Sequence, residues 1–135
     1  MVKRAIKTNG APAAIGPYSQ GIKASNLIFT SGQTPLVPGT MELIDGSVEE
    51  ATARCLDNIM AVLEAGGASM DDVVKCVVFL TDMNDFAAMN GVYASYFGET
   101  APARSCVQVA GLPKGARVEI EAIAAVAQFY PSPDH

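Results

Sequence analysis

The sequence predicts an α/β (α+β) domain in which a β-sheet carries two helices packed on one of its faces. Two segments have the apolar periodicity of helices, and segments typical of strands lie before, between and after them. Neither a linker nor an internal repeat divides the 135 residues, so we expect one domain spanning residues 1–135. Residues 131–135 are expected to form a disordered tail.

The first part of the chain predicts a pair of strands between two loops. Residues 20–24 and 27–31 have the composition of strands and flank Ser25-Asn26, a dipeptide suited to a two-residue hairpin turn. Proline and glycine are frequent in residues 11–18 and 33–46, which we therefore expect to be loops. The pattern leaves open whether a third strand precedes this pair.

Two helices are expected, one before and one after a continuous apolar strand at residues 73–80 in the sequence. The first begins at Ser47, which has the spacing of a capping box with Glu50, and ends at a Gly-Gly pair. The second ends before Gly98. Its stripe of large side chains, which we interpret as core packing against the sheet, consists of Phe86, Met89, Tyr93, Tyr96 and Phe97.

Residues 102–121 predict two further strands, joined by a Gly-Leu-Pro-Lys-Gly loop. Because side chains alternate along a strand, Arg104 and Cys106 share one face of the first strand. In the second strand, Glu119 and Glu121 share the face opposite its apolar residues. We expect the two strands to be neighbours, which could bring a cation and two carboxylates together. Such a group can bind a small anion and activate a water.

The expected sheet has more apolar surface than two helices can cover. Both helices lie on one face, yet the central strand at residues 73–80 is apolar on both faces. The second face therefore needs a cover, which another copy of the same chain can supply. We expect an obligate oligomer.

Charge and composition argue against several classes of protein. The net charge of −5 repels nucleic-acid phosphates, and the nine Lys and Arg residues are scattered. No apolar run approaches the roughly 20 residues that span a bilayer, and no signal-peptide core follows the basic N-terminus. Cys55, Cys76 and Cys106 are far apart and fit free thiols in a reducing compartment. We expect a cytoplasmic protein with no membrane partner and no nucleic-acid partner.

Histidine is almost missing from the sequence. The one histidine is His135, at the end of the expected tail. A Ser-His-Asp triad, a Cys-His pair, an HExxH zinc site and a histidine-based ribonuclease each need an internal histidine. Acid–base chemistry in this chain must therefore use carboxylates, Tyr, Lys or Cys.

Several blocks of sequence point to a known family. Residues 102–121 begin Pro-Ala-Arg-Ser-Cys-Val and end Val-Glu-Ile-Glu. Earlier blocks are Ala-Ala-Ile-Gly-Pro-Tyr-Ser-Gln at 13–20, Thr-Ser-Gly-Gln at 30–33, Leu-Asp-Asn-Ile at 56–59 and Asn-Asp-Phe-Ala at 84–87. In this order and spacing they resemble the RidA (YjgF) family of reactive-intermediate deaminases. The resemblance covers nearly the whole chain and is weakest at residues 35–46 and after residue 128.

The resemblance implies a chorismate-mutase-like fold with a mixed sheet, assembled as a homotrimer around an inner β-barrel with clefts between subunits. It implies hydrolysis of 2-imino acids, such as 2-iminobutanoate and 2-iminopropanoate, to 2-keto acids and ammonia. Pyridoxal-phosphate enzymes that act on serine and threonine release these imines. Neither a metal nor an organic cofactor is implied.

The resemblance also implies roles for individual residues. Arg104 falls on the family's carboxylate-binding arginine, and Glu119 on its water-activating glutamate. The other positions that line the family's cleft, and are implied to bind substrate, are Tyr18, Ser31, Gly32, Asn90 and Cys106.

Each assignment has a structural alternative. Either Glu119 or Glu121 can instead be a structural carboxylate bonded to Arg117 or to a backbone amide. Asn90 can be a helix-surface residue, and the cation beside Cys106 favours a reactive thiolate there. For the whole protein, the alternative is a ligand-sensing or partner-binding module without turnover, and less favoured still is an endoribonuclease or translation inhibitor.

Overall fold

The computed structural model describes residues 2–44 and 46–127, which form six strands and two α-helices. In chain order these are β1 (Lys3–Ile6), β2 (Gly21–Ala24), β3 (Leu27–Thr30), α1 (Val48–Ala65), β4 (Val73–Leu80), α2 (Phe86–Ser95), β5 (Ala103–Gln108) and β6 (Val118–Ala125). The prediction of an α+β domain is confirmed. The third N-terminal strand that the sequence left open is β1. The expected tail at 131–135 lies outside the described residues.

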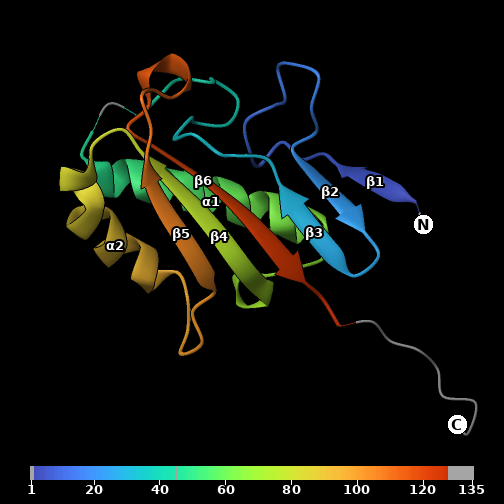
Figure 1. Ribbon diagram of the computed structural model, residues 1–135. Coiled ribbons are helices and arrows are strands. Elements are labelled where there is room, and N and C mark those ends of the chain that lie inside the picture. Colours follow the sequence, from blue (N-terminus) through green and yellow to red (C-terminus); the bar gives the residue numbers. More distant parts are fainter. Residues whose placement is uncertain (1, 45, 128–135) are drawn as a thin grey trace, which may run out of the picture.

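The strands form one mixed sheet in the order β1-β2-β3-β6-β4-β5. Neighbouring strands are antiparallel except β4 and β5, which α2 connects and which run parallel (Figure 1). The two strands on either side of the Gly-Leu-Pro-Lys-Gly loop were expected to be neighbours, and this expectation is wrong. They are β5 and β6, and β4 lies between them and pairs with both.

The core lies between the sheet and α1. Alternate residues of the central strands, Val78 of β4 and Ile120 of β6 among them, are fully buried against the helix. Helix α1 begins directly after Ser47, as predicted. The Ser47 hydroxyl accepts a hydrogen bond from the backbone N–H of Glu50 at 3.1 Å. The end of the helix is marked by Gly67, whose φ of +92° only glycine adopts without strain. Neither helix is long and apolar enough to cross a membrane, within the residues described.

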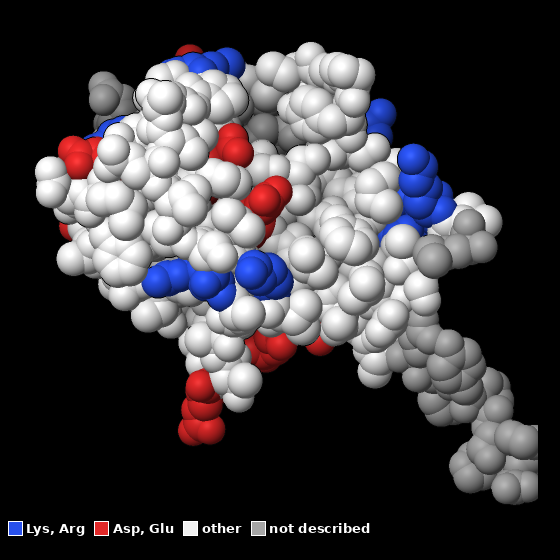
Figure 2. Space-filling model, in the orientation of Figure 1, with Lys and Arg blue, Asp and Glu red and all other residues white. Residues whose placement is uncertain are grey.

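The sheet face opposite the helices is open in this single chain. Figure 2 looks onto this face, where a few acidic and basic side chains lie among uncharged ones. Lys75 and Glu121 line one hollow of it together with Phe29 and Val77. Phe29 of β3 is 39% exposed there and Val107 of β5 is 44% exposed. Large apolar side chains left exposed along one sheet face are typical of an interface with another chain. The expected oligomer remains a prediction that this surface favours.

Candidate functional site

Arg104 lies on β5 and points toward α2. Its neighbour across the parallel pair is Cys76 of β4, which is buried on the helix-covered face of the sheet. The Nη1 group of Arg104 donates a hydrogen bond to Asn90 Oδ1 at 2.6 Å. Asn90 is therefore a half-buried hydrogen-bond partner of the arginine. The guanidinium also lies over the rings of Phe86 and Tyr93.

Cys106 shares the helix-facing side of β5 with Arg104, as the alternation predicted. Burial raises the pKa of the Cys106 thiol, and the nearby Arg104 charge lowers it by a smaller amount. The side chain is therefore a neutral thiol at neutral pH, which corrects the expectation that the cation would favour a thiolate. Cys55 and Cys76 are buried core residues, as expected.

Glu119 lies on β6 and faces the open side of the sheet. Burial, and secondarily the charge of Glu121 two residues away, raise the pKa of its carboxyl group. A carboxylate with a raised pKa is a stronger base than an exposed one. Arg117 does not pair with it, because the one ion pair among residues 2–44 and 46–127 joins Arg117 to Asp85 at 3.3 Å. The alternative in which Arg117 holds a glutamate is therefore wrong.

Gly32 contacts Glu119 because the chain that continues from β3 contains one extra residue between its two points of pairing with β6. Phe29 is opposite Ile123, but Gln33 is opposite Ile120, so three residues face two. The backbone of Gly32 consequently packs directly on the Glu119 side chain. A Cβ atom at residue 32 would lie 2.5 Å from Glu119 Oε2 and 2.8 Å from its Cδ. Glycine is required here for a close approach.

We expect Gly32→Ala to fold but to lose the imine hydrolysis that the family resemblance implies. The added methyl group meets the mobile end of a side chain, so the Glu119 carboxylate moves and the backbone does not. Displacing a reacting group by about 1 Å costs on the order of 10²-fold in kcat. Steady-state kinetics and thermal melting check this. Gly91→Ala is the matched control, since nothing lies within 4 Å of its added Cβ. Full activity in Gly32→Ala would contradict the placement of Glu119.

Tyr18 and Ser31 lie on the same side as Glu119. Tyr18 is 52% exposed and, with Gly32 and Glu119, lines one pocket. The hydroxyl of Ser31 donates to the Ser19 carbonyl at 2.5 Å, so its proton is already engaged in holding the loop. Of the two residues, Tyr18 is the one with a side chain available at the pocket.

Sequence reasoning missed two buried amides that shape this pocket. Gln20 donates from Nε2 to the carbonyls of Thr8, Ala11 and Pro12, at 3.0, 3.2 and 2.8 Å. Asn58, on α1, donates hydrogen bonds from Nδ2 to the carbonyls of Thr34 and Leu36, and so fixes the loop that follows β3. Amides within apolar segments are a signal of such bonds, because a buried polar group needs a partner.

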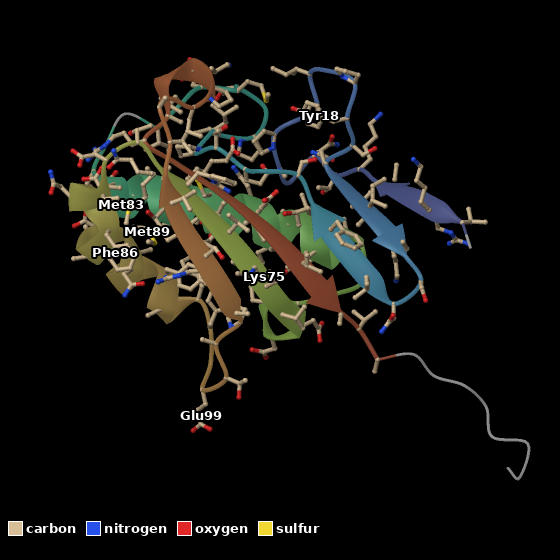
Figure 3. All side chains as sticks on the ribbon, viewed as in Figure 1. Tyr18, Lys75, Met83, Phe86, Met89 and Glu99 are labelled. Carbon is tan, nitrogen blue, oxygen red and sulfur yellow. The ribbon has the colours of Figure 1, made fainter. Side chains whose placement is uncertain are left out.

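The candidate residues form two separate groups. Arg104 and Cys106 lie on the helix-covered face with Asn90, whereas Glu119 lies on the open face near Gly32. In Figure 3, Phe86 on α2, which contacts Arg104, lies far from Tyr18, which lines the pocket with Glu119. The expectation that the arginine and the glutamate would meet on neighbouring strands is wrong for a single chain. No cluster of three or more potential metal ligands occurs among the described residues.

Comparison with known proteins identifies relatives over nearly the full chain. The family model described as endoribonuclease L-PSP matches residues 8–126. A RutC family protein of Pyrococcus horikoshii is 54% identical over 91% of this chain and 98% of its own. Escherichia coli TdcF, provisionally named a reactive intermediate deaminase, is 49% identical over 91% of this chain and 97% of its own.

Solved structures agree with the sequence relatives. The crystal structure of E. coli TdcF with bound serine has a TM-score of 0.88, 47% identity, and covers 92% of this chain and 99% of its own. RidA from a Psychrobacter species also has a TM-score of 0.88 with 47% identity, covering 91% of this chain and 99% of its own.

Proposed function

The chain belongs to the RidA (YjgF) family, described as endoribonuclease L-PSP, and on this premise we propose that it deaminates reactive 2-imino acids. The proposed substrates are 2-iminobutanoate and 2-iminopropanoate, and the products are the 2-keto acids and ammonia. The cell compartment we propose is the cytoplasm, where its free cysteines remain reduced. Neither a metal nor a cofactor takes part in this proposal.

Arg104 binds the substrate carboxylate in the proposed mechanism. Nη1 is bonded to Asn90, which leaves Nε and Nη2 to form two parallel hydrogen bonds with a carboxylate. Cys106 lies next to this site as a neutral thiol, so it acts by contact and not as a nucleophile. Tyr18 contributes its exposed phenol from the other side of the substrate.

Glu119 activates the water in the proposed mechanism. It accepts one proton as the water oxygen bonds to the imine carbon. The C=N π electrons move to the nitrogen, which takes up a proton from solvent, giving a carbinolamine. The C–N bond then breaks, its electrons leave with the nitrogen, and the hydroxyl proton passes to solvent as the keto group forms. Glu119 returns its proton to the departing ammonia. The raised pKa of Glu119 suits a group that must both take and give a proton near neutral pH.

One observation carries the proposal that each active site is shared by two subunits. Arg104 and Glu119 are on opposite faces of one sheet, so one chain cannot present both to one small substrate. A second copy that covers the open face brings its own residues toward the first subunit's Glu119. The resemblance to the family implies three subunits with clefts between them. From the two faces we assign Gly32 and Glu119 to one side of such a cleft, and Arg104, Asn90 and Cys106 of the next subunit to the other.

A second candidate function is ligand binding without turnover. The bound serine in the TdcF structure favours a site for small amino or imino acids in this family, but not a reaction. An endoribonuclease activity is disfavoured by the net charge of −5.

An imine-trapping assay tests the proposed function. A threonine dehydratase generates 2-iminobutanoate in the presence of semicarbazide, which traps the imine in competition with hydrolysis. We expect the purified protein to suppress semicarbazone formation in proportion to its concentration. Heat-denatured protein is the control. If trapping is unchanged at all protein concentrations, the deaminase proposal fails and the ligand-binding function takes its place.

A further inference from the structure

One face of α2 surrounds the Arg104 guanidinium. Phe86, Asn90 and Tyr93 are spaced four and three residues apart, which places them in a row on the helix. The Arg104 Cζ atom lies 4.8 Å from the Tyr93 ring centroid and 5.4 Å from that of Phe86. The guanidinium is thus held by two ring faces and by one hydrogen bond to Asn90. The row interpreted from sequence as core packing also contacts a charged group.

Tyr93 is fixed more firmly than an ordinary surface ring. It is 5% exposed, and its ring packs on Phe97 with the centroids 4.8 Å apart. Its buried hydroxyl makes no hydrogen bond of ordinary geometry among the described residues and has the weakly bonding thiol of Cys76 beside it. Burial raises the pKa of the phenol above its usual range, which keeps it neutral. The attraction to Arg104 therefore comes from the ring face and not from an ion pair.

Arg104 itself has no carboxylate partner within the described part of the chain. A long side chain of this kind samples many rotamers unless packing restrains it. Only its Nη1 is hydrogen-bonded among the described residues, to Asn90. The direction in which Nε and Nη2 point depends on the plane of the guanidinium, and the Tyr93 ring is the ring face nearest to it, 4.8 Å from Cζ.

We propose that Tyr93 is a positioning residue for Arg104, whose ring holds the guanidinium in the plane that accepts a substrate carboxylate in two parallel hydrogen bonds. The inference rests on the proposed function in one respect, the role of Arg104 as carboxylate anchor. Because the carboxylate does not react, its binding contributes equally before and in the transition state. Loss of the ring should therefore raise KM and leave kcat nearly unchanged.

The experiment compares Tyr93→Leu, Tyr93→Phe and Tyr96→Leu in steady-state imine hydrolysis. We expect Tyr93→Leu to raise KM about tenfold, the effect of losing one desolvated cation–ring contact. Tyr93→Phe restores KM to near the wild-type value because it keeps the ring. Tyr96→Leu is the matched control, since Tyr96 bonds Asp57 at 2.8 Å and does not contact Arg104. It should lower the melting temperature and leave KM unchanged.

A binding measurement separates this inference from the proposed reaction. Calorimetry with 2-oxobutanoate, a carboxylate probe, should give a Kd raised about tenfold in Tyr93→Leu. In an Arg104→Ala background the same substitution should have no further effect, because its contribution passes through the arginine. An equal effect in both backgrounds, or an unchanged Kd in Tyr93→Leu, overturns the inference even if the enzyme is active. If Tyr93→Leu does not fold, Tyr93→Met, which also lacks a ring, takes its place.

Discussion

Glu119→Gln is expected to abolish imine turnover while leaving the substrate site intact. Glutamine has nearly the same size but accepts no proton from water, so the general-base step is lost. Such help is typically worth about 10²–10⁴-fold, and we expect kcat to fall by that factor. Binding of 2-oxobutanoate should remain, because the proposed carboxylate anchor, Arg104 with its Asn90 partner, is unchanged and glutamine fills the same space as glutamate. Kinetics and calorimetry on the same preparation check both parts.

Glu121→Gln is the matched control for this substitution. It changes the same residue type on the same strand face, two positions further along β6. We expect turnover to persist. The negative charge of Glu121 raises the pKa of Glu119, so its removal should lower that pKa and move the acid limb of the pH profile to lower pH. Undiminished kcat in Glu119→Gln would remove the assigned role of Glu119.

Mixing two inactive variants is expected to restore activity. Arg104→Ala alone should raise KM strongly, because Arg104 is the cation that Asn90 holds in that pocket. Oligomers that contain both Arg104→Ala and Glu119→Gln subunits should regain turnover. Activity should return at each interface where an intact Arg104 meets an intact Glu119. With random assembly of equal amounts in a closed ring, about a quarter of the sites are intact. Activity after denaturation and refolding together, compared with separate refolding, measures this recovery.

The mixing experiment has a clear negative outcome. Native mass spectrometry should first establish that mixed oligomers form. If they form and no activity returns, Arg104 and Glu119 of different subunits do not share a site. A double variant carrying both substitutions in one chain is the control, since mixing it with itself leaves no intact site.

Much of the fold was predictable because local rules decide it. The capping residue Ser47 and the glycines after α1 mark its ends, and alternation assigns the faces of β5 and β6 correctly. Alternation does not say which strand lies between two others. The segment from β5 to β6 is too long for a tight hairpin and includes Lys114 with φ of +59°. That leaves room for β4 to pair with both strands.

The sequence supplied the candidate site residues but not their geometry. Arg104 and Glu119 were identified from sequence, yet their placement on opposite faces depends on the long-range pairing of β4 with β6. The row of Phe86 and Tyr93 was taken as core because aromatic residues at helical spacing usually are. Their contact with Arg104 is a tertiary feature. The same holds for Gly32, whose approach to Glu119 follows from an extra residue in the pairing.

The central position of β6 has a consequence for biosynthesis. This strand is the last described element of the chain, yet it lies between β3 and β4 and completes the sheet. Until residues 118–125 leave the ribosome, β3 and β4 lack the strand that pairs with both of them. The sheet is then in two parts, and α1 cannot pack on a continuous face. The nascent chain therefore exposes apolar side chains until β6 has been made, and its sheet closes only then. Pairing between distant segments also makes that closing step slow, so a chain stopped before β6 is a substrate for chaperones and proteases.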